Sequence, residues 1–265
     1  MRSARQSLKP QALRLAGDTL CRHLPWDSDF FGYRIARAMG ERLTKGELQS
    51  VCDWCREERI DCLYFLADPA DDAGLRRLEK HRFQLVDSRV TLRRSGALAA
   101  APLELPRVRV RPYSDSDFAG LREIARTNHR NTRFSKDGHF PSALCDALYE
   151  RWIENSCQGQ ADRVLVAEWE GQPAGYITCH RESSSAGRIG LFAVDERARG
   201  KGLGADLIRE AIQWFQSEEI SDILVATQGD NEPAQRVYRK RGFLVESIRL
   251  WFHYWPRLSE SHRPR

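Results

Sequence analysis

A glycine-rich turn at a strand-to-helix junction is the segment of this sequence best suited to chemistry. The turn, Arg199-Gly200-Lys201-Gly202-Leu203-Gly204, follows an apolar run over 188–194 and opens a helical pattern over 205–215. Glycines let backbone N–H groups approach phosphate oxygens closely, and a helix N-terminus contributes about half a positive charge. The turn therefore predicts a site for a diphosphate, and its position favours Arg199 as a phosphate contact over a solvated charge.

The residues around the turn narrow the class of ligand. A P-loop for nucleoside triphosphates is excluded because the turn does not end in Gly-Lys-Ser or Gly-Lys-Thr. A dinucleotide fold is disfavoured because the neighbouring strands are predicted to form hairpins rather than successive crossovers. Groups of glycines also occur in ordinary turns, so the cofactor has to be inferred from residues elsewhere in the chain.

Short strands interleaved with amphipathic helices must position this turn. Apolar runs and alternating patterns predict strands over 107–111, 163–168, 174–181, 188–194, 223–227 and 243–252. Helices are predicted over 117–127, 144–154, 205–215 and around 234–240, with a polar loop over 131–140. Because hairpins join most of the strands, the predicted fold class is α+β with a mixed, largely antiparallel sheet.

Two parts of the chain share one β-α-β pattern. Residues 61–83 and 222–243 each contain a strand, a helix and the start of a second strand, and their lengths differ by one residue. The first copy has no glycine turn and carries Leu78 where the second carries Tyr238. The repeat predicts a duplicated scaffold in which only the second copy holds a cofactor. Chance similarity of two common amphipathic units is the alternative.

The repeat and a shift in composition predict the domain organisation. Residues 95–106 are rich in small residues and contain two prolines, which is typical of a linker. We therefore expect a truncated N-terminal domain over 1–94, a linker over 95–106, a second domain over 107–257 and a flexible tail over 258–265.

Two motifs in the second domain resemble those of a known family. Residues 194–204 are similar to motif A of the GCN5-related N-acetyltransferases (GNAT), and the pattern Asn231-x-x-Ala234-x-x-x-Tyr238-x-Lys240-x-Gly242-Phe243 is similar to motif B. The resemblance implies the GNAT acyl-CoA N-acyltransferase fold, preceded by a smaller degenerate GNAT-like domain. It also implies direct transfer of acetyl from acetyl-CoA, as cosubstrate, to an amine.

The resemblance further implies roles for individual residues. Tyr238 lies seven residues after Asn231, the family's spacing for the proton donor to the leaving thiolate. A core tyrosine with a satisfied hydroxyl is the alternative. The diphosphate is expected at the amides of the turn, and the amide-rich arm of the cosubstrate is expected along the preceding strand. The cofactor-binding residues implied are Phe192, Ala193, Val194, Arg199, Gly200, Lys201, Gly202, Leu203, Gly204 and Asn231.

Four further segments, over 149–155, 188–191, 225–228 and 245–247, resemble bacterial nucleotide-sugar acetyltransferases. This implies a nucleotide-linked amino sugar as the acceptor. The residues expected to contact it are Arg133, Phe134, Trp152, His180 and Glu182. Arg133 suits a diphosphate and Phe134 a base or sugar face, with surface packing as the competing interpretation. His180 and Glu182 are also candidates for the general base, directly or through water, although exposed residues at a hairpin end are the commoner case.

Two other functions stay open at the level of sequence. The acceptor could be another amine, such as a protein N-terminus, a polyamine or an aminoglycoside, or the protein could be a non-catalytic sensor that binds acetyl-CoA. Arginines around the acceptor would favour a sugar nucleotide, whereas an acidic groove would favour a peptide or polyamine. The loop histidines His129 and His139 are not included in the predicted site, because lone loop histidines are usually solvated.

The bulk composition predicts a globular protein, and the small-molecule acceptor is implied by the resemblance. The 265 residues are 41% hydrophobic and 30% charged, with a net charge of +5. The basic residues are spread along the chain, so no nucleic-acid partner is expected. No apolar stretch approaches the roughly 20 residues needed to cross a bilayer, and residues 1–10 lack a signal-peptide core. We expect a cytoplasmic protein without membrane insertion, and a homodimer is left open.

The seven cysteines do not predict a disulfide framework, because their spacing is irregular. Cys52-Asp53-Trp54-Cys55 is a lone C-x-x-C pair within a helical pattern over 46–59, and a second pair for zinc does not accompany it. These cysteines are therefore expected to be helix residues, at least one of them packed inward, and no metal site is predicted.

Overall fold

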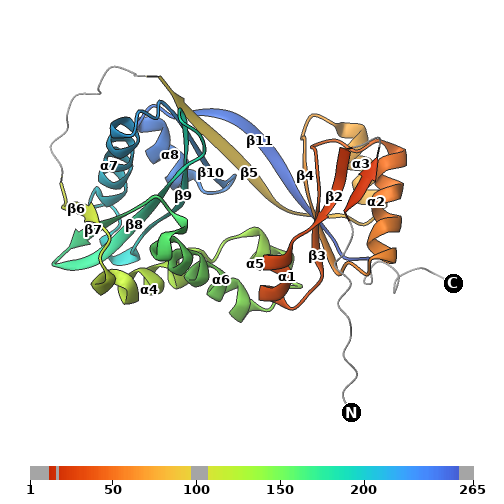
Figure 1. Cartoon of the computed structure of the whole chain (residues 1–265), viewed down its shortest axis with the longest axis horizontal. Coiled ribbons are helices and arrows are strands. Elements are labelled where there is room, and N and C mark those ends of the chain that lie inside the picture. Colours follow the sequence, from red (N-terminus) through yellow and green to blue (C-terminus); the bar gives the residue numbers. More distant parts are fainter. Residues whose placement is uncertain (1–11, 16–17, 97–106, 257–265) are drawn as a thin grey trace, which may run out of the picture. The chain divides into compact units, whose positions relative to one another are not determined.

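The computed structural model describes residues 12–15, 18–96 and 107–256 (Figure 1). The chain forms two compact units, one made of Met1–Asp87 with Arg249–Arg265 and the other of Ser88–Ile248. We call them unit 1 and unit 2.

Unit 1 contains a small sheet with two principal helices. Its strands follow the order β1-β2-β3-β4-β11, in which β3 and β4 are parallel and the other pairs are antiparallel. All six residues of β4 are buried, as expected of a strand covered on both faces. The elements are β1 (Leu13–Leu15), β2 (Asp18–His23), α1 (Pro25–Phe31), β3 (Ile35–Ala38), α2 (Lys45–Glu57), β4 (Cys62–Ala67), α3 (Asp72–Lys80) and the end of β11 (Leu244–Tyr254).

Unit 2 has strands in the order β5-β10-β9-β8-β7-β6, of which only β9 and β10 run parallel. Its strands are β5 (Gln84–Ser95), β6 (Val110–Pro112), β7 (Arg163–Trp169), β8 (Gln172–Arg181), β9 (Ala186–Val194) and β10 (Asp222–Gln228). Its helices are α4 (Phe118–Asn128), α5 (Arg133–Asp137), α6 (Ser142–Asn155), α7 (Leu203–Ser217) and α8 (Glu232–Lys240). The prediction of an α+β fold with a mixed, largely antiparallel sheet is confirmed.

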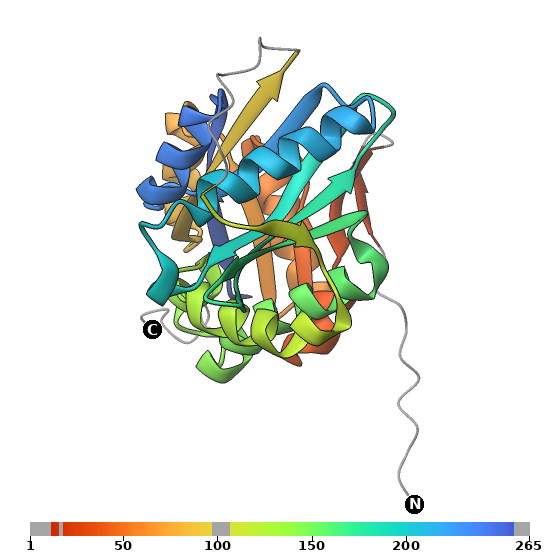
Figure 2. The ribbon, with the colours of Figure 1, turned by 90° about the vertical axis from the view of Figure 1, so that its left-hand side faces the viewer.

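Helices cover both faces of the unit 2 sheet. Helix α7 packs on β7, β8 and β9, whereas α4 packs on the other side against β8, β9 and α6, as Figure 2 shows. The apolar residues of α7 recur every three or four positions, and Leu207, Ala211 and Phe215 are fully buried in the core. The glycine turn immediately before α7 is therefore held by a rigid core.

The loop predicted over 131–140 contains the short helix α5, which the sequence analysis missed. Thr132 is its N-cap, with its hydroxyl accepting from the Ser135 N–H at 3.5 Å, and Gly138 ends it with a φ of 77°. A polar cap and a following glycine are ordinary helix boundary signals, but they enclose only five residues, too few to show a helical period.

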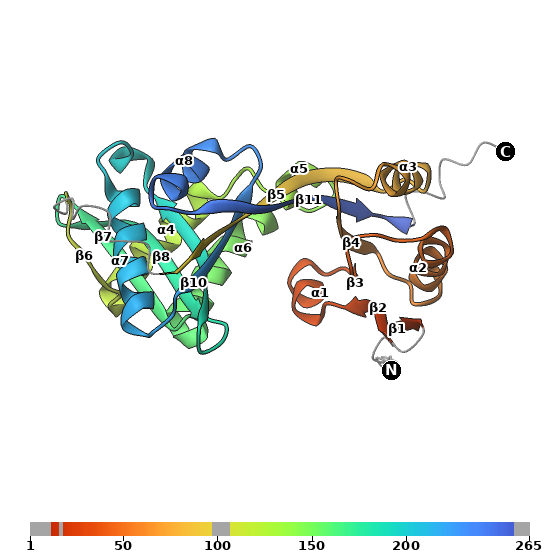
Figure 3. The ribbon, with the colours of Figure 1, turned by 90° about the horizontal axis from the view of Figure 1, so that it is seen from above.

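The two compact units do not follow the predicted domain boundaries. Strand β5 continues beyond Asp87 to pair with β10 in unit 2, and the last residues of β11 pair with β4 in unit 1 (Figure 3). Each of these strands thus contributes to both units, which a division at 94 and 107 does not capture. Most of the predicted linker and all of the predicted tail lie outside the described residues, and the predicted domains stay a prediction.

Among the residues that the structure describes, no helix is both long enough and apolar enough to cross a membrane.

Candidate active site

The central feature of the candidate site is the separation of two parallel strands. Strands β9 and β10 pair from Ala186 opposite Asp222 to Ile189 opposite Val225, and no further. The rest of β9, up to Val194, pairs only with β8 on its other side. The backbone of β9 after Ile189 therefore has an edge on which an extended, amide-containing molecule could add hydrogen bonds.

A β-bulge lies where this edge begins. The β8–β9 register shifts between Ile177 and Cys179, which places one extra residue in β9. The Leu191 N–H donates to Thr178 Oγ1 at 2.8 Å, and a Cβ at Gly190 would lie 2.7 Å from the same oxygen. Only glycine fits there without a shift of its neighbours. Bulges of this kind are common beside active sites because they redirect backbone groups.

The glycine turn presents an open set of backbone donors. Gly200 and Gly202 have φ values of 77° and 95°, which side-chain-bearing residues rarely adopt. The first backbone hydrogen bond of the helical turn runs from the Asp206 N–H to the Gly202 carbonyl at 3.1 Å. Within the described parts of the chain, the N–H groups of residues 200–205 have no acceptor. Unsatisfied donors at a helix N-terminus form an anion-binding site.

The turn and the strand edge are in direct contact. A Cβ at Gly204 would lie 3.1 Å from Cζ of Phe192, so the absence of a side chain lets α7 approach β9. Asp206, only 3% exposed, accepts hydrogen bonds from the Arg107 and Val108 N–H groups and from Arg209. These contacts anchor the first turn of α7, so the donors before it are fixed in place.

Two positively charged side chains, Arg199 and Lys201, lie at the turn. The Arg199 guanidinium donates to Asn128 Oδ1 at 2.6 Å and has a side chain that is 57% exposed. The Lys201 ammonium lies 5.8 Å from the centre of the Trp169 ring. Both side chains add positive charge at the mouth of the anion site.

Tyr238 on α8 is placed beside the strand edge. Its ring centre lies 5.7 Å from that of Phe192 and 5.5 Å from that of Phe243, and the residue is 2% exposed. Burial raises the pKa of its hydroxyl, so this phenol keeps its proton near neutral pH. The position suits a proton donor, and it also fits the alternative of a core tyrosine.

Asn231 is the N-cap of α8. Its Oδ1 accepts from the Ala234 N–H at 3.3 Å, and its Nδ2 donates to Thr227 Oγ1 at 3.1 Å. Both ends of the amide are therefore used within the chain. The structure gives Asn231 a capping role, and its expected contact with the cofactor stays a prediction.

His180 has a defined tautomer at the bulge. Its Nδ1 lies 3.2 Å from the Gln160 carbonyl, which can only accept, so Nδ1 carries the proton. Nε2 is then an acceptor, 3.3 Å from Thr178 Oγ1. Desolvation, followed by the charge of Arg188, lowers the pKa of His180 below its ordinary value. The imidazole is therefore neutral near pH 7, as a general base must be.

Two other residues that were expected to contact the acceptor, Glu182 and Phe134, are engaged in contacts within the chain. Glu182 forms an ion pair with Arg188 at 2.7 Å, away from the bulge. Phe134 is 2% exposed, with Arg133 at 4.1 Å over its ring and Trp152 at 6.3 Å from it. The ring thus has no open face for a base or sugar in this conformation, which does not support the role expected for Phe134.

His129 was not included in the predicted site, yet it lies among its aromatic residues. Its ring stacks on Tyr149 at 4.2 Å, and it hydrogen-bonds to the Tyr176 hydroxyl at 3.1 Å. Desolvation lowers its pKa to about 4, so it is neutral at physiological pH. No spacing in the sequence links these three residues, because they come from three different elements.

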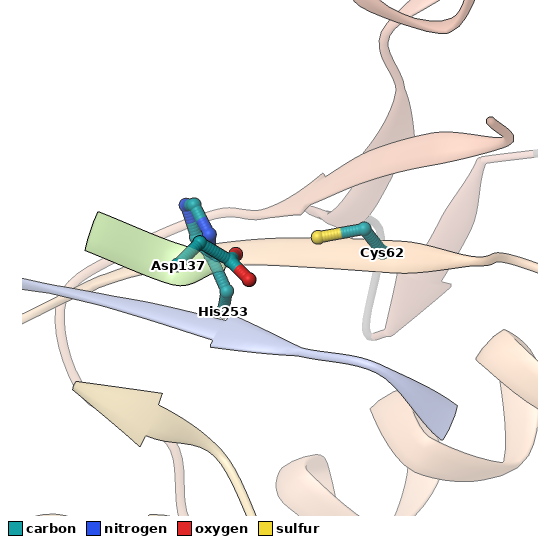
Figure 4. A group of neighbouring side chains, drawn as sticks. All are labelled: Cys62, Asp137 and His253. Atoms are coloured by element: carbon teal, nitrogen blue, oxygen red, sulfur yellow. The ribbon is translucent and has the colours of Figure 1, made fainter. Parts of the chain in front are cut away.

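The cysteines of unit 1 are packed inward. Cys52 and Cys55 are both on α2 and are 5% and 0% exposed, and burial raises the pKa of each thiol. On the sheet of the same unit, Cys62 of β4 and His253 of β11 lie on adjacent strands (Figure 4). Asp137, also drawn there, belongs to unit 2. Two side chains do not define a metal site, and the expectation that the chain binds no metal stays a prediction.

The candidate site therefore consists of a sheet whose two parallel strands separate at a bulge, followed by a glycine turn and a helix. The family described as "Acetyltransferase (GNAT) family" matches residues 121–243, so the chain contains a GNAT-family domain over these residues. Solved structures share the fold across nearly the whole chain. A GCN5-related N-acetyltransferase from Sphaerobacter thermophilus has a TM-score of 0.65 at 14% identity, covering 91% of this chain and 78% of that one.

A second solved structure bears on the two-unit organisation. A tandem GNAT protein from the clavulanic acid biosynthesis pathway has a TM-score of 0.61 at 17% identity and covers 92% of this chain and 82% of that one. Because this neighbour covers both units, its fold fits a two-domain arrangement of this chain.

Curated relatives match between half and three fifths of this chain. The dTDP-fucosamine acetyltransferase of Escherichia coli O6:H1 is 30% identical over 52% of this chain and 60% of its own length. The spore coat polysaccharide biosynthesis protein SpsD of Bacillus subtilis is 25% identical over 55% of this chain and 50% of its own length. The mycothiol acetyltransferase of Mycobacteroides abscessus is 26% identical over 59% of this chain and 54% of its own length. The chain thus spans between half and two thirds of the relatives it matches.

Proposed function

We propose that this protein is an N-acetyltransferase that moves acetyl from acetyl-CoA to the amine of a nucleotide-linked amino sugar. The observation that carries the transfer activity is the contact between the unsatisfied amides of residues 200–205 and the open edge of β9. One part suits a diphosphate and the other an extended chain of amides, and coenzyme A contains both.

The residues present fit this cosubstrate. The amides of residues 200–205, with Arg199 and Lys201, would hold the diphosphate. The backbone of Phe192, Ala193 and Val194 would pair with the amide-rich arm. Acetyl-CoA supplies the acetyl group as a thioester, and the chain supplies a binding site that fixes its orientation.

Two side chains would transfer protons during the reaction, one as a donor and one as an acceptor. Tyr238 retains its proton because of burial and would donate it to the departing thiolate. His180 would accept the proton of the attacking amine through Nε2, directly or by way of water. Charge on the carbonyl oxygen needs a backbone donor. The Leu191 N–H already donates to Thr178, so that donor would come from another residue of β9.

The acceptor class is supported by the relatives. One of them is named as an enzyme of a nucleotide sugar and another as a protein of polysaccharide biosynthesis. Others are named as mycothiol and N-alpha acetyltransferases, so related domains use several amines. The proposal includes a small-molecule acceptor rather than a nucleic acid, a cytoplasmic location where acetyl-CoA is made, and a homodimer as an open arrangement.

Acetyl-CoA turnover with a panel of amines tests the proposal. Release of free thiol would be measured with amino sugar nucleotides, small amines and peptides under identical conditions. We expect release with at least one sugar nucleotide. Release with peptides alone would contradict the acceptor class, and tight CoA binding without release from any amine would indicate a sensor instead.

A further inference from the structure

We propose that Arg89, together with Arg133 and Arg188, forms a second anion subsite in unit 2 that binds the diphosphate of the acceptor. This inference rests on the proposed function, because it names the part of the acceptor that the protein recognises. It is separate from the glycine turn, which would bind the diphosphate of the cosubstrate.

Strand register brings two of the arginines to one face of the sheet. Arg89 on β5 pairs with Gln228 on β10, and Arg188 on β9 pairs with Leu224 on the same strand. Gln228 and Leu224 are four residues apart, and side chains alternate along a strand with a period of two. Arg89 and Arg188 therefore project from the same face.

This face is also the face of the proposed base. Ile223 and Val225, which alternate with Leu224, are buried in the core that contains the apolar residues of α7. The arginines consequently lie on the side away from α7. His180 pairs with Arg188 in the β8–β9 register and shares that side. An acceptor bound there would have its charged end and its amine on the same face of the sheet.

The segment that carries the third arginine, Arg133, is fastened by a hydrogen bond before it and an ion pair after it in sequence. Asp230 accepts from Asn131 Nδ2 at 2.8 Å and from Lys136 Nζ at 2.9 Å. Asn131 and Lys136 flank Arg133 on the segment that contains α5. The carboxylate of Asp230 thus fixes this segment to the turn between β10 and α8.

The same turn is bonded to the strand that carries Arg89. The Gly229 N–H donates to the Ser88 carbonyl at 2.9 Å, and a Cβ at Gly229 would collide with the Ser88 hydroxyl. Because Ser88 directly precedes Arg89 and Gly229 directly precedes Asp230, the α5 segment lies beside Arg89.

One arginine of this cluster, Arg89, lacks an acidic partner among the residues that the structure describes. Arg188 pairs with Glu182, and Arg133 lies over the ring of Phe134, but Arg89 has no ion pair within the described residues. Desolvation lowers the pKa of Arg89, and the charges of Arg188 and Arg133 act in the same direction. A half-buried guanidinium without an acidic partner costs free energy, which an anionic ligand would offset.

A neighbouring arginine, Arg93, has its charge compensated by carboxylates of the chain. Arg93 is on the same strand and the same face as Arg89, and it contacts Asp222 and also Glu246, the latter at 2.6 Å. On this face of β5, the chain therefore neutralises Arg93 and leaves Arg89 without an acidic partner among the described residues.

A diphosphate suits the cluster better than a carboxylate. Guanidinium groups bind phosphate oxygens through paired hydrogen bonds, and several of them can share the two charges of a diphosphate. A nucleotide sugar carries such a group between its base and its sugar, at some distance from the amine that reacts.

Calorimetric titration of dTDP and of inorganic pyrophosphate into the full chain, saturated beforehand with CoA, tests the subsite. Saturation with CoA removes binding at the glycine turn from the signal. We expect Arg89→Gln to weaken dTDP binding about 10-fold, since hydrogen bonds to charged groups are among the stronger ones. The matched variant Arg93→Gln should change it less than about twofold, and Asp230→Asn, which releases the α5 segment, about threefold.

The outcomes separate this inference from the proposed function. Equal dTDP affinity in Arg89→Gln and the unmodified protein, or weaker CoA binding in Arg89→Gln, would overturn the subsite while leaving acetyl transfer intact. Absence of dTDP binding to the CoA-saturated protein would overturn it as well. Loss of dTDP affinity in Arg89→Gln together with no thiol release from any amine would support the subsite and contradict the enzyme.

Discussion

The two units contain the same strand-helix arrangement. They differ at the start of the helix that connects their two parallel strands, which is α7 in unit 2 and α2 in unit 1. In unit 2 the amides before α7 are unsatisfied and the turn is built of glycines. In unit 1 the start of α2 is a capping box, in which the Thr44 hydroxyl accepts from the Glu47 N–H and the Glu47 carboxylate accepts from the Thr44 N–H. One helix end is closed by its own side chains, and the other is left open for a ligand.

The surroundings of the two helix ends differ in charge as well. A small hollow in unit 1 is bordered by Glu41, Asp68 and Asp71 near the start of α3. Leu78, at the place that Tyr238 has in unit 2, contributes to its lining. Each of these carboxylates forms an ion pair with an arginine of unit 1, so the charged groups there are partnered within the chain, whereas the amides before Asp206 in unit 2 have no acceptor among the described residues. The comparison teaches that the open donors and the tyrosine, rather than the fold, carry the proposed activity.

The largest effect should follow from placing a carboxylate in the open turn. Gly200→Asp puts a negative charge among the amides, at a position where a Cβ meets nothing within 4 Å. The positive φ should cost about 1–2 kcal/mol of stability, a strain that the control variant shares. We expect CoA affinity to fall about 100-fold, because like charges at an interface cost several kcal/mol. Gly40→Asp in unit 1, also at positive φ and without close contacts, is the control. An equal loss of CoA affinity in both variants would show that the two helix ends do not differ as described.

Removing the hydroxyl of Tyr238 should affect turnover rather than binding. We expect Tyr238→Phe to lower kcat by about 10- to 10⁴-fold, within or below the range of general acid catalysis, with CoA affinity unchanged. Steady-state kinetics and CoA titration would measure the two quantities, with Tyr64→Phe in unit 1 as the control. Unchanged turnover would make Tyr238 a core residue like its counterpart Leu78.

Loss of the proposed base should change the pH profile. His180 has a pKa below its ordinary value of 6.5, and its base form is lost as the pH falls through that lowered pKa. The unmodified enzyme should therefore keep its kcat/KM to below pH 6.5 and lose it in more acidic solution. In His180→Gln we expect kcat/KM to fall about 100-fold and the acidic limb to disappear. His23→Gln in unit 1 should leave the profile alone, and an acidic limb that persists without His180 would exclude this role.

The smallest effect is expected at the closed helix end. Thr44→Ala removes the cap of α2 and should lower the free energy of unfolding by about 1 kcal/mol, without a change in CoA affinity. Urea denaturation followed by circular dichroism would measure the first quantity and calorimetry the second. A loss of CoA affinity here would mean that unit 1 takes part in binding the cosubstrate.

Some of the site could be predicted because its signals are local. The glycine turn is contiguous in sequence. Asn231 caps α8 and Tyr238 lies within the same helix, so a fixed spacing in sequence places both residues. Period and turn chemistry likewise predicted α7 and the hairpins of unit 2. The domain boundaries could not be found in this way, because β5 and β11 each enter both units and strand pairing over long sequence separation leaves no local pattern.

By itself, then, the sequence determined that this chain has an α+β fold, a glycine turn at a strand-to-helix junction and motifs of the GNAT family. Tertiary structure alone decided that β9 separates from β10 at Ile189, that His180 lies beside the bulge with its Nδ1–H on the Gln160 carbonyl, and that Arg89 shares a face with Arg188. Each of these depends on register between strands, and a shift of one residue would turn every side chain of a strand to the opposite face.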